Sequence, residues 1–103
     1  MIITTTALVE GSPVKQYIGV ATGEVIMAAN VGRDILASVR DLVGGRSKAY
    51  ETKLSEAREV ALIEMAEYAT QMGGNAVIGV DINYAVVKQG MLMVAASGTA
   101  VII

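Results

Sequence analysis

A long helical pattern ends at Gly73 and Gly74, and a run of apolar residues typical of a strand begins within three residues of it. Paired glycines end a helix well because glycine readily adopts the left-handed conformation that follows a helix C-terminus. Residues 75–86 are rich in Val, Ile and Tyr, which favour strands. The junction therefore predicts a long helix that is followed directly by a strand and packs on a sheet.

This helix is predicted over residues 47–72, with Ser47 as its N-cap, and its apolar residues form one stripe. The stripe comprises Tyr50, Leu54, Ala57, Ala61, Met65, Tyr68 and Met72. The opposite side carries Thr52, Glu56, Glu59 and Glu67. The pattern is typical of a helix that covers one face of a sheet. Ile63 projects from the polar side, where it either has no role or marks a contact between subunits.

The rest of the chain predicts four strands and a second, shorter helix. The strands are predicted over residues 2–6, 14–29, 75–86 and 91–103, with a hairpin near residues 88–90. The short helix is predicted over residues 30–43, with Asn30 as its cap and Asp34 in its first turn. The order β-β-α-α-β-β indicates a single α+β domain over residues 1–103, in which the long amphipathic helix packs on a small antiparallel sheet.

The predicted strands carry more apolar surface than one helix covers. Residues Ala76, Ile78, Val80, Ile82 and Tyr84 share one face of the third strand and are expected under the helix. The fourth strand is apolar on both faces, with Leu92, Val94 and Ala96 on one and Met91, Met93 and Ala95 on the other. Because the helix hides only one face, we expect the other to meet a second copy of the chain.

Two glycines in the second strand indicate an unusual local contact. Gly19 and Gly23 are four residues apart, so both fall on one face of the strand. Missing side chains at these positions predict a bulge or the close approach of another backbone.

The amino-acid composition indicates which kinds of partner the chain can bind. The 103 residues are 53% hydrophobic with a mean hydropathy of +0.54, which again favours self-association. A net charge of −2 without a basic run argues against a nucleic-acid partner.

No apolar run reaches the roughly 18 residues of a membrane helix, and residues 1–6 do not resemble a signal peptide. We expect a soluble cytoplasmic protein that does not interact with membranes, and the absence of Cys excludes disulfides.

Metal ligands are scarce in this sequence. Thiolate and imidazole ligands are absent, because the chain contains neither Cys nor His. Asp81 and Asn83, two apart on one strand face, are candidate oxygen ligands for a hard metal ion, with Glu24 as a third. The alternative is an ordinary polar strand edge.

Candidate groups for catalysis or anion binding are dispersed along the sequence. Ser97 and Thr99 are expected across the hairpin from Gly79 and Val77, on the same face as Asp81, where they form either a small polar pocket or ordinary cross-strand packing. A second group comprises Gly44, Gly45, Arg46 and Ser47, which precede a helix and form either an anion site or a helix break and cap.

Charged residues also flank the stripe of the long helix. Glu51 and Arg58 lie two turns apart on one flank, and Glu64 lies on the other. Structural ion pairs and paired catalytic carboxylates are the two interpretations of these charges.

Several short motifs together resemble the YbjQ-like family, which is labelled as heavy-metal-binding. They are Ile3-Thr4-Thr5-Thr6, Tyr17-x-Gly19, Gly23-Glu24, Arg33-Asp34, Gly44-Gly45-Arg46-Ser47, Tyr50-Glu51, Ala57-Arg58, Ala61-Leu62-x-Glu64-Met65, Asn75-Ala76-Val77-x-Gly79-Val80 and Ser97-Gly98-Thr99-Ala100-Val101. The resemblance spans nearly the whole chain. It implies a helix on an antiparallel sheet and subunits arranged in a ring, a pentamer. Asn83 departs from the family pattern, which has Asp there.

The leading hypothesis is a non-catalytic ring that binds a small ligand or ion at subunit interfaces, with a metal ion as one candidate. The candidate ligand or interface residues are Arg33, Asp34, Arg46, Glu51, Arg58 and Asp81. One alternative is an enzyme with an interface site built from Glu51, Glu64, Asp81 and Ser97. Another is a structural or adaptor ring that presents the helix face around Ile63 to a different protein.

Overall fold

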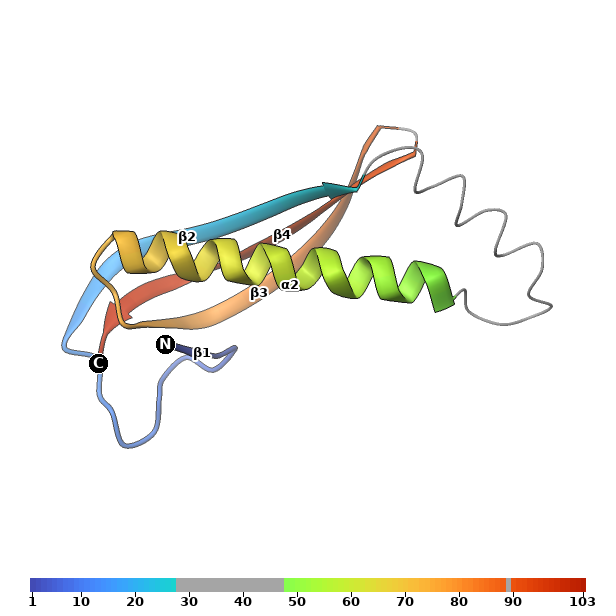
Figure 1. Cartoon of the computed structure of the whole chain (residues 1–103). Coiled ribbons are helices and arrows are strands. Elements are labelled where there is room, and N and C mark those ends of the chain that lie inside the picture. The colour runs from blue at the N-terminus through green and yellow to red at the C-terminus, as the bar shows by residue number, and fades with distance from the viewer. Residues whose placement is uncertain (28–47, 89) are drawn as a thin grey trace.

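The computed structural model describes residues 1–27, 48–88 and 90–103, and the side chains from residue 51 onward in the helix (Figure 1). The elements are β1 (Ile2–Ile3), β2 (Gln16–Met27), α2 (Lys48–Gln71), β3 (Ala76–Lys88) and β4 (Met91–Ile102). The long helix and the strands therefore lie close to their predicted ranges. The predicted helix over residues 30–43, the glycine pair before the long helix, and Arg33, Asp34, Arg46 and Ser47 lie outside the described residues.

The four strands form one mixed sheet with the order β1-β3-β4-β2. β4 pairs antiparallel with both β2 and β3, but β1 runs parallel to β3. The prediction of a purely antiparallel sheet was therefore wrong. The physical reason is the connection over residues 4–15, which carries the chain from β1 at one edge to β2 at the opposite edge, so the first two strands are not neighbours.

The first strand is shorter than predicted because threonines turn the chain after Ile3. The Thr4 hydroxyl accepts a hydrogen bond from the Thr6 backbone N–H at 3.1 Å, and such local bonds favour turns over strands. The backbone still contacts β3, since Thr4 N–H donates to the Val77 carbonyl at 3.0 Å and Gly79 N–H donates to the Thr6 carbonyl at 2.8 Å. These residues thus hold the chain against the outer side of β3.

Helix α2 covers one face of the sheet (Figure 1). The side chains that it packs against the strands are mostly small. Ala57, Ala61, Met65 and Ala69 are buried at intervals of four residues and pack on the strands. Tyr68 was predicted in this stripe but is 48% exposed, whereas Ala69 is fully buried. Ala69 rather than Tyr68 faces the sheet because α2 lies close to the strands. A tyrosine side chain at this contact would push the helix away from the sheet. Thr52, Glu56, Glu59 and Glu67 are exposed, as predicted.

A bulge at Gly79 changes which residues of β3 face the helix. The register shifts between Ile78 and Asp81, and Gly79 has a φ of 61°. Val77 and Val80 both join the core under α2, while Ala76 and Ile78 pack in a separate cluster on the other face. The prediction that Ala76 and Ile78 lie under the helix was therefore wrong, because the extra residue reverses the alternation.

The bulge also changes the partners across the hairpin. Ser97 lies opposite Asp81, and Thr99 lies opposite Ile78, rather than opposite Gly79 and Val77. The hairpin itself is confirmed, with Lys88 opposite Met91 and Gly90 at a φ of 78°. Among the described helices, none has the length and apolar character needed to span a membrane.

Candidate functional site

The sheet face that points away from α2, the open face, carries four of the candidate residues, namely Glu24, Asp81, Asn83 and Ser97. On β2, Ala21 and Gly23 are buried toward the helix, so alternation places their neighbours on the open face. Val20 and Ile26 are 68% and 52% exposed there. By register, the open face comprises Val20, Thr22, Glu24, Ile26, Asp81, Asn83, Ala85, Met93, Ala95, Ser97 and Thr99. It is a mixed surface of five apolar and six polar residues, with a polar centre in the middle of β2, β3 and β4.

The polar centre is a row of three side chains on adjacent strands. Ser97 of β4 lies opposite Thr22 of β2 and opposite Asp81 of β3. The Asn83 amide donates a hydrogen bond of 2.6 Å to Asp81 Oδ2, which fixes the orientation of that carboxylate. The structure therefore brings together the predicted residues Asp81, Asn83 and Ser97. Thr22 was missed, although the alternation of the second strand could have placed it on the same face.

Glu24 does not complete a metal site within one subunit. It lies opposite Ala95, which in turn lies opposite Asn83, so two strand spacings, roughly 10 Å, separate Glu24 from Asn83. Over the described part of the chain, no group of three His, Cys, Asp or Glu residues could hold a metal ion. The predicted set of Glu24, Asp81 and Asn83 is thus spread over the sheet.

The charged candidates on the helix lie on the other side of the sheet. Arg58 is half-buried, and its Nη1 donates a hydrogen bond of 3.3 Å to the Tyr84 hydroxyl. Glu51 is exposed in the first turn of α2. Glu64 lies on the flank near β2, where its Cβ is 3.0 Å from the point that a Cβ on Gly23 would occupy. Arg58 and Glu64 therefore flank the stripe on opposite sides, as predicted.

These positions separate the residues proposed for catalysis. Glu51 and Glu64 lie on α2, whereas Asp81 and Ser97 lie on the open face, and the sheet stands between them. Groups that act on one reacting atom must lie within hydrogen-bond reach of it. Within a single subunit, this set of four residues cannot meet that condition.

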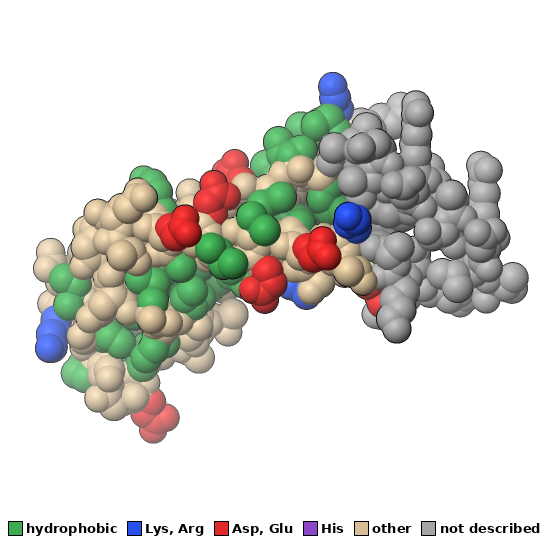
Figure 2. All heavy atoms as spheres, viewed as in Figure 1, with side chains coloured by type: hydrophobic (Ala, Val, Ile, Leu, Met, Phe, Trp, Pro, Cys, Tyr) green, Lys and Arg blue, Asp and Glu red, His purple; other side chains and the backbone are tan. Residues whose placement is uncertain are grey.

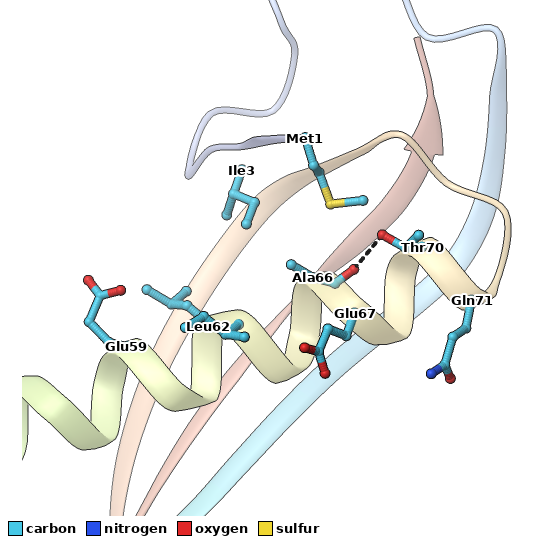
Figure 3. A pocket seen from close by; sticks show the side chains of 9 residues that line it. Met1, Ile3, Glu59, Leu62, Ala66, Glu67, Thr70 and Gln71 are labelled. Carbon is cyan, nitrogen blue, oxygen red and sulfur yellow. Dashed lines mark hydrogen bonds between the residues drawn. The ribbon is translucent and has the colours of Figure 1, made fainter.

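A shallow groove of about 680 Å³ lies between β1 and the outer side of α2 (Figure 3). It is lined by Met1, Ile3, Glu59, Leu62, Ile63, Ala66, Glu67, Thr70 and Gln71. The Thr70 hydroxyl donates a hydrogen bond of 2.9 Å to the Ala66 carbonyl, so its proton is already used within the helix. Glu59 and Glu67 are eight residues apart, roughly 12 Å along the helix, and do not form a pair. The groove is mainly an apolar surface.

The outer face of α2 is acidic with apolar side chains among the charges (Figure 2). Glu56, Glu59 and Glu67 are exposed along it. Ile63 is 54% exposed between them, as its predicted place on the polar side requires. This face differs from the open face, which has few charges.

Comparison with known proteins gives a consistent result. All of residues 1–103 match the YbjQ family, described as "Putative heavy-metal-binding". The chain is 57% identical over 101 residues to a UPF0145 protein of Bacillus anthracis and to one of Bacillus cereus, covering 98% of each chain. The fold is similar to a Pediococcus pentosaceus protein of unknown function from the DUF74 family, with a TM-score of 0.62, 23% identity and coverage of 100% and 97% of the two chains. These findings confirm the predicted resemblance.

Proposed function

The chain belongs to the YbjQ-like family, and on that basis we propose that it is a non-catalytic protein that assembles with copies of itself into a ring. In this proposal the ring binds a small ligand or ion between subunits. The observation that carries the proposal is a sheet that, within the described residues, has two long edges without a neighbouring strand and exposed apolar side chains, such as Val20 and Ile26, on the face away from α2. The family resemblance implies five subunits, and we adopt that number.

The unpaired edges lie on β2 and on the second half of β3. β2 is an edge strand of 12 residues, and β4 is its partner in the described sheet. On β3, contacts with the N-terminal segment end at Val80, whose N–H donates to the Thr4 carbonyl at 3.1 Å. Within the described residues, the outer edge of β3 beyond Val80 has no strand beside it. Both edges therefore offer backbone groups for pairing.

The composition of β2 suits pairing with another chain. Soluble proteins usually protect edge strands with Lys, Pro or a bulge in the middle of the strand. From residue 19 to residue 27, β2 pairs in a continuous register and contains neither Lys nor Pro, and Glu24 is its one charged residue. If β2 of one copy pairs with β3 of the next, the contact uses two different surfaces, and such contacts generate closed rings when the rotation closes.

Exposed apolar side chains lie along the same region. Val20 and Ile26 are exposed on β2, and Val86 and Val87 near the hairpin tip are 75% and 52% exposed. The tip of the β3–β4 hairpin projects away from α2 (Figure 1). The principal extents of 52 × 24 × 16 Å and a radius of gyration of 16.6 Å describe an elongated molecule, whereas a compact domain of about 100 residues has a radius near 13 Å. Contact with a second copy would bury the exposed apolar side chains of β2 and the hairpin tip.

Native mass spectrometry and light scattering on untagged protein test the assembly. We expect a closed oligomer for the native chain and subunits of lower order for Ile26→Lys, because the charge would be placed in the proposed contact. The matched control is Ile63→Lys, which changes an equally exposed isoleucine on the helix (54% against 52%) and should leave the oligomer intact. A native monomer, or an oligomer disrupted by the change at Ile63 but not at Ile26, would contradict the proposal.

Asp81→Ala tests the binding role of the polar row. Asp81 is exposed, so we expect its loss to change the free energy of unfolding by less than about 0.5 kcal/mol and to preserve the oligomer. Any small molecule that copurifies with the native ring should be reduced or absent in the variant. Disruption of the oligomer by Asp81→Ala would instead assign this residue a structural role in the interface.

A further inference from the structure

The description of the family names heavy metals, and we infer that this chain does not bind a soft heavy metal in either its single-subunit or its assembled form. The inference rests on the proposed function, because it narrows the class of ligand that the ring can take. It is carried by the donor atoms of this sequence and by their positions in the fold.

Nitrogen and thiolate donors of the usual kind are missing from the whole sequence. Soft and borderline metals such as Zn²⁺, Cd²⁺ and Cu⁺ are held in proteins mainly by Cys thiolates and His imidazoles. The 103 residues include no Cys and no His. A homo-oligomer repeats one sequence, so assembly of further copies supplies no such ligand either.

Oxygen donors do not replace the missing Cys and His ligands. The Asp81 carboxylate already accepts the Asn83 amide proton at 2.6 Å, and Glu24 lies two strands away. Oxygen ligands of this kind suit hard cations such as Mg²⁺ and Ca²⁺ rather than soft ones.

Methionine thioethers are the remaining soft donors, and the fold spreads most of them apart, although Met91 and Met93 lie two residues apart on one face of β4. Met65 is fully buried in the core. Met72 packs against Gly19, with its terminal methyl 3.0 Å from the position of an added Cβ. Met27 packs toward the core under α2, whereas alternation places Met93 on the opposite face of the sheet. Methionine acts here as a packing residue.

The test is a competition between the untagged, assembled protein and a chromophoric chelator for Zn²⁺ and Cd²⁺. We expect the apparent Kd of the chelator to stay unchanged and the Tm of the protein not to rise on metal addition, since a ligand of the folded state would raise it. Removal of one metal ion per subunit from the chelator, or a metal-dependent rise in Tm, would overturn the inference.

A designed variant shows that the assay can detect a site in this fold. Thr22→His combined with Ser97→His places two imidazoles beside the native Asp81 on three adjacent strands. Three such ligands resemble a zinc site with an open position, so we expect the variant to raise the apparent Kd of the chelator for Zn²⁺ about tenfold or more. In the same assay, the native chain should leave the apparent Kd of the chelator for Zn²⁺ unchanged.

A second arm uses Cu⁺ with a Cu⁺-specific chelator, because thioethers prefer this ion. We expect no competition from the native ring. Competition that disappears in Met93→Leu would reveal a thioether site formed between subunits and would overturn the inference. Either result leaves the oligomer measured by mass spectrometry unchanged, so failure here is distinguishable from failure of the ring proposal.

Discussion

At Gly23 the backbones of the helix and the sheet lie close together. A Cβ at this position would collide with the Ala61 carbonyl oxygen and would lie 2.7 Å from the Met65 backbone nitrogen. Both are backbone atoms of α2, so a side-chain rotation cannot relieve the contact. Glycine is required here because it allows the two backbones to approach directly.

We predict that Gly23→Ala destabilises the protein by about 1–3 kcal/mol, because the added methyl group overpacks the helix–sheet contact. Urea denaturation followed by circular dichroism measures the change in the free energy of unfolding. Gly19→Ala is the matched control, since its Cβ would meet only the flexible end of Met72 at 3.0 Å. Equal losses in the two variants would show that the close backbone approach is not the cause.

At the scale of the element, the bulge in β3 decides the surface chemistry of the sheet. Before Gly79 the odd-numbered Val77 faces the helix, and after it the even-numbered Val80 does. The shift places Asp81 and Asn83 on the open face, on the side of the sheet away from α2. It also leaves Ala76 and Ile78 to pack with Val9 and Val14 on the other side of the sheet.

We predict that Gly79→Val costs about 1–2 kcal/mol because a β-branched residue is poorly tolerated at a φ of 61°. An added Cβ at Gly79 meets no atom within 4 Å, so the cost is conformational rather than steric. Gly79→Asn should cost less, since Asn adopts left-handed conformations more readily. A flat strand without a bulge would give the opposite order, with Val the better tolerated of the two. Thermal unfolding of the pair distinguishes these outcomes.

At the scale of the molecule, the chain has two partly independent surfaces. One is the acidic outer face of α2, with the shallow groove beside β1 (Figures 2 and 3). The other is the open face with its unpaired edges, which we propose as the contact between copies. The second surface carries two exposed carboxylates, Glu24 and Asp81, among apolar and small polar side chains. Burial of this surface would couple folding to assembly.

We predict that the Tm of the native protein rises with protein concentration. In an assembly that holds the folded state together, tenfold dilution costs about 1 kcal/mol per subunit, which lowers the Tm by roughly 4–8 °C for a small domain. Calorimetry over a hundredfold concentration range measures the effect. The Ile26→Lys variant should show a smaller dependence. A Tm that does not depend on concentration in the native protein would argue for a stable monomer.

Local patterns in the sequence were sufficient to predict the long helix and the C-terminal hairpin, and they gave a close backbone contact at Gly19 and Gly23 as one of two alternatives. Each depends on neighbouring residues: a period near four for α2, two glycines to end it, and alternation in β4. The same patterns placed Asp81 and Ser97 on one face of the sheet, and the absence of Cys and His limited the metals that the chain can bind. These features require no knowledge of distant contacts.

The parallel pairing of β1, the bulge at Gly79 and the burial of Ala69 in place of Tyr68 depended on tertiary contacts. Strand order depends on how residues 4–15 cross the sheet, which no local periodicity records. A single inserted residue in β3 reverses every later side chain, so its faces could not be assigned until the register with β4 was known. The helix stripe differs from the prediction at one position, where Ala69 is buried in place of Tyr68, because the close approach of α2 to the sheet leaves room for the smaller side chain.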